Sequence, residues 1–174
     1  SALNLDKMLW TNQQHMLRST PEHLARYLRP QLEALGLVAD DLAKVAAVAR
    51  AQQERAKTLR EMAANSQFFF RDLSGYDEKA AAKNLTAETA PVLEAVGSKL
   101  AQLPDWKAPA IHVAIMAVAE ALGLGLGKVA QPIRVAVSGG TVSPPIDVTL
   151  EILGRETTLQ RLAGAIDSAR RTRS

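Results

Sequence analysis

The side chains that most often perform catalysis are sparse in this sequence of 174 residues. It contains no cysteine, which excludes a thiol nucleophile, a disulfide framework and a cysteine-based zinc site. His15, His23 and His112 are scattered with no carboxylate at a matching spacing, and we interpret each as a surface or packed histidine rather than a base. The sequence also lacks an H-E-x-x-H pair, so we predict neither a catalytic residue nor a bound metal ion.

One glycine-rich stretch, Gly123 to Lys128, superficially resembles a nucleotide-binding loop. A phosphate-binding loop of that kind needs a strand before it, a helix after it and a hydroxyl residue after the lysine. This stretch lacks that context and that hydroxyl, and we interpret it as the end of one helix and the start of another. We therefore expect no cofactor in this chain.

Positively charged side chains remain as candidates for binding. The 21 Lys and Arg exceed the 18 Asp and Glu only slightly, and this net charge of +3 permits a nucleic-acid partner without requiring one. The segment 44–71 is more informative, since it holds six basic residues and two acidic ones. A positive helical face there would follow a phosphate backbone, whereas the alternative is an ordinary solvated face. The six basic residues are Lys44, Arg50, Arg55, Lys57, Arg60 and Arg71.

Helices must position these side chains, because alanine, leucine, glutamate and arginine dominate and aromatic residues make up only 4%. We predict an all-α fold. Thr20 and Pro21 are typical of a helix start and Gly36 of its end, and Pro30 is expected to kink or split that helix. Asp40 or Asp41 is expected to cap the next helix. The apolar positions of the other expected helices fall in 5–16, 42–49, 59–63, 78–85, 92–100, 111–122, 146–153 and 156–171.

The segment 128–137 allows two interpretations. Val135 and Val137 alternate as in a strand, and Gly139-Gly140 would suit a hairpin turn, but the segment is also compatible with a helix. Residues 141–145, which include two consecutive prolines, are predicted to form an extended loop.

The chain is expected to form two helical subdomains, residues 1–76 and 77–174, because Ser74-Gly75 ends the first series of helices. The most apolar run, 108–119, is too short to cross a bilayer, and the N-terminus has no signal-peptide pattern. We therefore expect a cytoplasmic protein without a membrane partner. The start at Ser1 instead of Met suggests a piece of a longer protein, with N-terminal processing of a small protein as the alternative.

Five motifs follow one another along the chain. They are D-K-M-L-W-x-N-x-x-H at 6–15, R-A-K-T-L-R-E-M at 55–62 with Phe69-Phe70 after it, D-x-x-A-A-A-K-x-L at 77–85, G-x-G-K-V-x-x-P-I-R-V-A-V-S-G at 125–139 followed by Ser143-Pro144, and Leu153-Gly154-Arg155-Glu156 with Arg161-Leu162. This series resembles the region that follows the catalytic region of bacterial glutamyl-tRNA synthetases, and the resemblance covers essentially the whole chain.

The resemblance implies an α-helix cage, the anticodon-binding region of a class I aminoacyl-tRNA synthetase, and it favours a helix for 128–137. The catalytic domain of the family carries H-I-G-H-like and K-M-S-K-S-like signatures, which are absent here. The parent enzyme would attach glutamate to its tRNA with ATP and Mg²⁺, whereas this chain alone is expected to be inactive. Its expected partner is the anticodon stem-loop of glutamate tRNA, bound by a monomer.

The resemblance also implies that Arg55 reads the third anticodon base, which is cytosine for glutamate and guanine for glutamine. A guanidinium only donates hydrogen bonds, so it satisfies the acceptors of cytosine and leaves guanine with unpaired donors. Family members that also charge glutamine tRNA tend to carry glutamine at this position, so Arg55 implies a protein that excludes that tRNA. Without the family, an exposed helical arginine paired with Glu54 or Glu61 is an equal alternative.

By the same resemblance, Arg134 would contact the first anticodon base, and Ser143, Pro144 and Ile146 would hold the middle uridine. Phe68–Phe70 and Trp106 are expected to pack in the subdomain cores rather than to stack on bases. The alternative function for the whole chain is a non-catalytic scaffold whose basic face meets an acidic protein. The candidate phosphate contacts, each with a solvated helix charge as its alternative, are Arg50, Lys57, Arg60 and Lys128.

Overall fold

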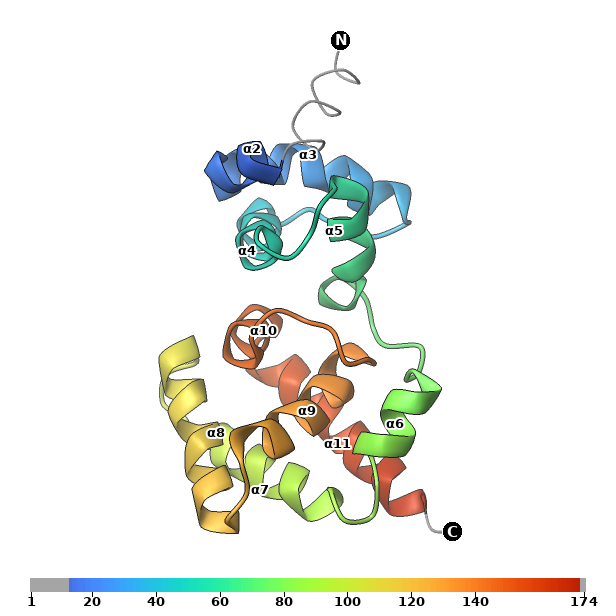
Figure 1. Ribbon diagram of the computed structural model, residues 1–174, viewed down its shortest axis with the longest axis vertical. Helices are drawn as coiled ribbons and strands as arrows, with labels where there is room; N and C mark the ends of the chain where they lie inside the picture. Colours follow the sequence, from blue (N-terminus) through green and yellow to red (C-terminus); the bar gives the residue numbers. More distant parts are fainter. Residues whose placement is uncertain (1–12, 173–174) are drawn as a thin grey trace. The chain divides into compact units, whose positions relative to one another are not determined.

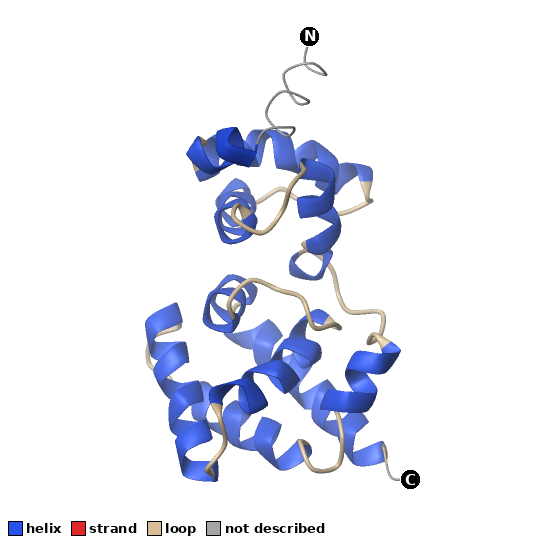
Figure 2. Ribbon diagram, in the orientation of Figure 1, coloured by secondary structure: helices blue, strands red, loops and turns tan. Residues whose placement is uncertain are grey.

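The computed structural model describes residues 13–172, and within this range it contains ten α-helices, one short 3-10 turn and no strand (Figure 1, Figure 2). This architecture confirms the predicted all-α class. Residues 6–12 of the D-K-M-L-W motif, and with them most of the first expected helix, lie outside the described residues.

The chain divides into two compact units, an N-terminal unit that ends at Asp72 and a C-terminal unit that begins at Leu73. The sequence predicted the division after residue 76. Residues 73–76 instead group with the C-terminal unit, and the backbone N–H of Asp77, which follows them, donates to the carbonyl of Gly139 at 2.7 Å.

The N-terminal unit is built from helices whose starts follow local capping chemistry. The Thr20 hydroxyl accepts from the N–H of His23 at 3.1 Å, and the Asp41 carboxylate accepts from that of Lys44 at 3.2 Å, as predicted. Pro30 does not split its helix, because it removes a single backbone hydrogen bond from a helix that also packs against its neighbours. The elements are α2 (Gln13–Arg18), α3 (Pro21–Ala34), α4 (Leu42–Gln52), α5 (Leu59–Asn65) and the 3-10 turn η1 (Gln67–Phe69).

The core of this unit lies where α3 meets α4 and α5. Leu28 and Leu32 of α3, Val45 and Val48 of α4, and Met62 of α5 are all buried there. Removing these side chains from water supplies the main stabilisation of the unit, at about 1.5–3 kcal/mol for each large apolar side chain.

The C-terminal unit contains six helices. Helix α7 packs against α8 and α11, and α9 contacts α6, α8 and α11, so α9 occupies a central position. The helices are α6 (Glu78–Asn84), α7 (Ala90–Ala101), α8 (Ala108–Leu122), α9 (Leu126–Ser138), α10 (Ile146–Leu153) and α11 (Arg155–Arg171).

The ambiguous segment 128–137 lies inside α9, so the helix implied by the family resemblance is confirmed and the strand-and-hairpin interpretation is wrong. Val135 and Val137 are fully buried in the unit, and this burial outweighs the local β preference of valine. Gly139 ends the helix with a φ of +83°, a left-handed conformation that favours glycine. Gly123 ends α8 in the same way, with a φ of +66°.

Within residues 13–172, none of the helices combines the length and the apolar character that a membrane span requires.

Candidate nucleic-acid interface

Arg55 lies in the turn between α4 and α5, and its side chain is exposed. The sequence left open whether the segment 44–71 forms a positive helical face or an ordinary solvated face, and in the structure the turn at 53–58 divides this segment between α4 and α5. Among the described residues, Arg55 forms no ion pair with Glu54 or Glu61. The structure therefore does not show the alternative interpretation, in which Arg55 lies on a helix and pairs with an acidic neighbour.

Backbone hydrogen bonds hold this turn in shape. The N–H groups of Arg55 and Ala56 donate to the carbonyl of Gln52 at 2.9 and 3.0 Å. The Thr58 hydroxyl caps α5 by accepting from the N–H of Glu61 at 3.0 Å, and the Glu61 carboxylate accepts from the N–H of Lys57 at 3.1 Å. Glu61 thus fixes the backbone beside Arg55 and leaves the guanidinium exposed.

Two glutamines at the end of α4 hold the start of the same turn, and the sequence analysis did not identify them. The side-chain amide of Gln52 donates to the hydroxyl of Ser66 at 3.2 Å. The side-chain amide of Gln53 donates to backbone carbonyls at the end of α2. Consecutive glutamines at a helix end carry no distinctive pattern, so only the folded arrangement reveals their role.

The four candidate phosphate contacts are all exposed, but their local settings differ. Arg50 lies in the last turn of α4, where a positive charge interacts favourably with the helix dipole. Arg60 and Lys128 lie in the first turns of α5 and α9, where a positive charge opposes the dipole. Interaction with the helix dipole therefore does not account for the cations at those two positions.

Arg134, on α9 of the C-terminal unit, is half-buried and is held by its neighbours. Its Nε donates to the hydroxyl of Ser143 at 2.8 Å, and its Nη1 donates to the side-chain oxygen of Gln131 at 2.6 Å. The Ser143 hydroxyl in turn donates to the carbonyl of Pro144 at 2.7 Å, which also accepts from the Thr149 hydroxyl at 3.0 Å. This network joins α9 to α10 through the loop 139–145 and brings together two predicted site residues, Arg134 and Ser143.

The three residues predicted to hold a base, Ser143 and Pro144 of the loop and Ile146 at the start of α10, are buried. Ser143 is 3% exposed and Ile146 is 8% exposed, and Pro144 is also buried. The loop residues on the surface are Thr141, Val142 and Pro145, with Val142 65% exposed. A Ser-Pro-Pro-Ile sequence predicts an extended loop but does not indicate which of its side chains are buried.

Contacts at the C-terminal end of α9 fix where the loop begins. The guanidinium of Arg161 on α11 donates from Nη1 to the carbonyl of Val137 at 2.6 Å. The Ser138 hydroxyl donates to the carbonyl of Arg134 at 2.7 Å and accepts from the N–H of Gly140 at 3.2 Å. Arg161 belongs to the last of the sequence motifs, and here it positions the loop.

Of the aromatic residues predicted to pack in the cores, Phe68 and Phe69 do so, whereas Phe70 and Trp106 are half-buried. The indole N–H of Trp106 donates to the carbonyl of Leu150 at 2.9 Å, and the guanidinium of Arg155 lies 5.5 Å from its ring centre. These contacts leave the rings engaged with the protein rather than available for stacking on bases.

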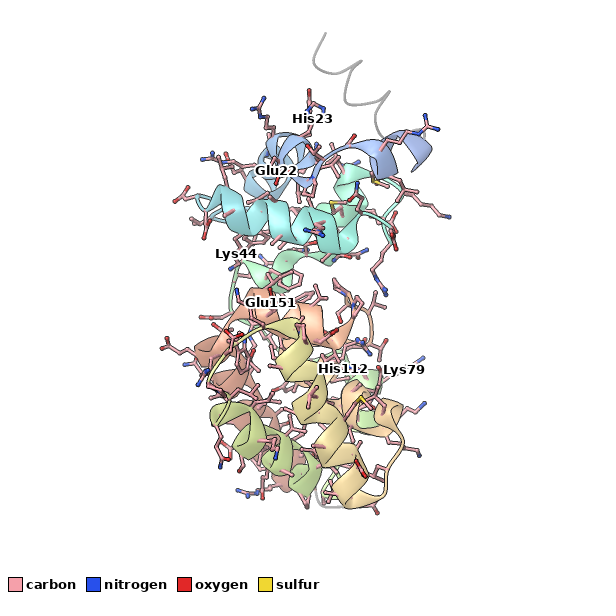
Figure 3. All side chains as sticks on the ribbon, turned by 90° about the vertical axis from the view of Figure 1, so that its left-hand side faces the viewer. Glu22, His23, Lys44, Lys79, His112 and Glu151 are labelled. Carbon is pink, nitrogen blue, oxygen red and sulfur yellow. The ribbon has the colours of Figure 1, made fainter. Side chains whose placement is uncertain are left out.

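Two of the histidines singled out by residue type occupy ordinary surface positions in Figure 3. His23 projects from α3 and packs edge-on against Tyr27, with ring centroids 5.2 Å apart. His112 lies half-buried on α8. Glu151 of α10, also labelled in Figure 3, has a structural role, because its carboxylate accepts from the N–H of Ala108 at the start of α8.

Known proteins match this chain over most of its length. The model of the anticodon binding domain family matches residues 23–166. The chain is 54% identical over 167 residues to glutamate–tRNA ligase 1 of Alkalilimnicola ehrlichii, covering 96% of this chain and 36% of that relative. It is 50% identical over 170 residues to glutamate–tRNA ligase 2 of Halorhodospira halophila, covering 98% of this chain and 36% of that relative. The chain thus spans about a third of the length of these relatives.

Solved structures show the same fold. A glutamate tRNA ligase from Elizabethkingia meningosepticum, crystallised with its amino acid, matches with a TM-score of 0.82 and 30% identity over 92% of this chain and 32% of that one. The glutamate–tRNA synthetase of Elizabethkingia anophelis matches with a TM-score of 0.76 and 30% identity over 91% of this chain and 30% of that one.

Proposed function

Because this chain belongs to the anticodon-binding domain family and is the counterpart of the C-terminal part of bacterial glutamate–tRNA ligases, we propose that it binds the anticodon stem-loop of glutamate tRNA. The observation that carries this proposal is the extent of the family match. Residues 23–166 include both the Arg55 turn and the loop 139–145, which carry the predicted base contacts.

Arg55 reads the third anticodon base in this proposal. Cytosine presents the acceptors N3 and O2 on its pairing edge, and an exposed guanidinium donates to both. Guanine presents N1–H and N2–H₂ donors there, which a donor-only side chain cannot satisfy. The exposure of Arg55 and the absence of an ion pair with Glu54 or Glu61 in the described chain support this role, and the consequence is exclusion of glutamine tRNA.

The C-terminal unit supplies the contacts to the other two bases. Arg134, held through Nε by Ser143, contacts the first anticodon base. The loop 139–145 holds the middle uridine, with Ser143, Pro144 and Ile146 forming its buried support. A loop with two prolines and a buried polar network loses little entropy on binding, because it is already ordered.

The cations Arg50, Lys57, Arg60 and Lys128 bind phosphates of the stem-loop. Phosphate contacts set the register and supply affinity without reading sequence. The glutamate-joining reaction, with its ATP and Mg²⁺, belongs in this proposal to the longer ligase, and we assign no catalytic residue in this chain.

Binding of a fluorescent anticodon stem-loop to the full chain tests the proposal. We expect the affinity to fall with salt, with a log–log slope of about −0.9 for each phosphate contacted in duplex RNA or DNA and about −0.7 in single strands. We also expect a stem-loop of glutamate tRNA to bind more tightly than one of the same size from an unrelated tRNA. Equal affinities for the two stem-loops would contradict the proposal and favour a scaffold with a basic face, which an acidic protein competitor would then reveal.

A further inference from the structure

The side chain of Gln53 connects the Arg55 turn to a helix elsewhere in the N-terminal unit. Its amide Nε2 lies 2.8 Å from the carbonyl oxygen of Met16, 3.2 Å from that of Leu17 and 2.8 Å from that of Ser19. Met16 and Leu17 belong to the last turn of α2, and Ser19 directly follows that helix. We propose that Gln53 is a positioning residue that sets the register of the Arg55 turn for base discrimination, an inference that rests on the proposed function.

The chemistry of this contact requires a donor with the reach of glutamine. The amide nitrogen carries two hydrogens and faces three acceptors, so at least one hydrogen is shared between two carbonyls. Alanine at this position has no donor, and asparagine carries the amide on a chain shorter by one methylene. Both substitutions leave the carbonyls of α2 without this partner.

The turn is held at its start from two sides. Gln53 binds the end of α2, and its neighbour Gln52 donates from its side chain to Ser66, beyond the end of α5. The carbonyl of Gln52 then accepts from the N–H groups of Arg55 and Ala56. The two residues at the start of the Arg55 turn are therefore each bound through their side chains to a different element, Gln53 to the end of α2 and Gln52 to Ser66.

Arg55 depends on this backbone because its own side chain has no such anchor. Its guanidinium is exposed and makes no ion pair with its acidic neighbours in the described part of the chain. A shift of about 1 Å in the Arg55 backbone is enough to misalign the hydrogen bonds from its guanidinium to a base. The same shift hardly changes the electrostatic attraction between its positive charge and a phosphate. Loss of the Gln53 contact should therefore reduce the preference for C over G as the third anticodon base more than it reduces the overall affinity for the stem-loop.

The test compares Gln53→Ala and Gln53→Asn with the wild-type full chain. The matched control is Gln31→Ala, which removes a glutamine from α3 of the same unit without touching the turn. Two stem-loops that differ only in the third anticodon base, C or G, give a ratio of affinities. Hydrogen exchange of the Arg55 and Ala56 amides provides a second readout that needs no RNA, and thermal unfolding identifies any variant that fails to fold.

We expect Gln53→Ala to lower the C-over-G ratio by at least about fivefold, the equivalent of one weakened base contact. Its Arg55 and Ala56 amides should exchange faster, while Gln31→Ala behaves as the wild type. Gln53→Asn should show the same changes in affinity ratio and exchange rate with less loss of stability. This variant therefore tests the role of Gln53 if the alanine variant does not fold.

An unchanged ratio and unchanged exchange in a folded Gln53 variant would overturn the inference. A fall in affinity for both stem-loops alike, with the ratio intact, would also overturn it by showing a purely structural role. A wild-type chain without any preference for C over G contradicts the proposed function instead, and in that case the exchange rates alone decide whether Gln53 holds the turn.

Discussion

The two arginines of the proposed reading site, Arg55 and Arg134, are held by the protein in different ways. Arg55 is exposed on a turn whose backbone is held, whereas Arg134 is half-buried and oriented through bonds from Nε and Nη1 to Ser143 and Gln131. An arginine oriented in this way loses less side-chain entropy on binding than one that is free to rotate.

Arg55→Gln should relax the choice of the third anticodon base. The glutamine amide both donates and accepts, so it can pair with guanine as well as with cytosine. We expect about 1–3 kcal/mol of discrimination to be lost, measured as the ratio of affinities for stem-loops with C or G as the third anticodon base. An unchanged ratio would remove Arg55 from the reading site.

Lys57→Ala is the matched comparison for that experiment, because it removes a neighbouring positive charge without removing a base contact. It should weaken the C and G stem-loops alike and make the salt slope shallower by about 0.7–0.9, the value for one phosphate.

At the scale of elements, helix starts and ends were predictable wherever local chemistry determines them. Thr20, Asp41 and Gly123 all act in the structure as their residue types predicted. The sequence separated the helices at 42–49 and 59–63, but it did not locate the turn at 53–58 between them, since this turn contains neither glycine nor proline. The available signal was Thr58 followed three residues later by Glu61, a capping-box pattern that marks a helix start.

Other features depend on tertiary contacts, so local sequence patterns could not predict them. The valines of α9 alternate as in a strand, and only burial among neighbouring helices makes the segment helical. Ser143 was predicted as a base contact from its motif, but the structure shows a buried hydroxyl between Arg134 and Pro144. Which side chains of a loop face solvent depends on what packs beneath it.

Gly139→Ala should destabilise the C-terminal unit. The left-handed φ of +83° costs an alanine about 1–2 kcal/mol, and an added Cβ would lie 3.0 Å from the carbonyl oxygen of Gly75, closer than ordinary contact. Urea unfolding of the full chain measures the loss. Gly140→Ala is the control, because a Cβ there meets nothing within 4 Å, and equal losses in the two variants would contradict this account.

At the scale of the whole molecule, each unit encloses its own apolar core. Met62 and Leu28 are buried within the N-terminal unit, and Ile133 and Leu162 within the C-terminal one. The sequence predicted two helical parts from the spacing of their breakers. It placed residues 73–76 with the N-terminal part, because these residues form no helix and tertiary contacts, at Gly139 and between Tyr76 and Gly164, attach them to the C-terminal unit.

The stability of the C-terminal unit should depend on pH in the alkaline range through Tyr76. Burial raises the pKa of the Tyr76 hydroxyl above its ordinary value of 10.0, and the positive charge of Arg171 opposes this shift only in part. A raised pKa in the folded state means that the folded chain holds this proton more tightly than the unfolded chain. The contribution of Tyr76 to the free energy of unfolding is therefore complete below pH 10.0 and declines as the pH rises above it.

Urea unfolding of the wild type and of Tyr76→Phe between about pH 8 and pH 11 measures this dependence. The wild type should lose more stability than the variant across the upper part of the range, because phenylalanine has no proton to release. Parallel curves for the two proteins would show that Tyr76 does not contribute.

The attachment of residues 73–77 also determines where this chain can be cut without harm. The Gly75 carbonyl lies against Gly139, and the Asp77 N–H donates to the Gly139 carbonyl, at the point where the loop 139–145 begins. A protease that cleaves before Leu73 leaves both contacts in place. One that cleaves between Gly75 and Asp77 should free the carbonyl of Gly139 and loosen the start of the loop. A cut a few residues from the boundary would then act on a loop that begins more than sixty positions further along the chain.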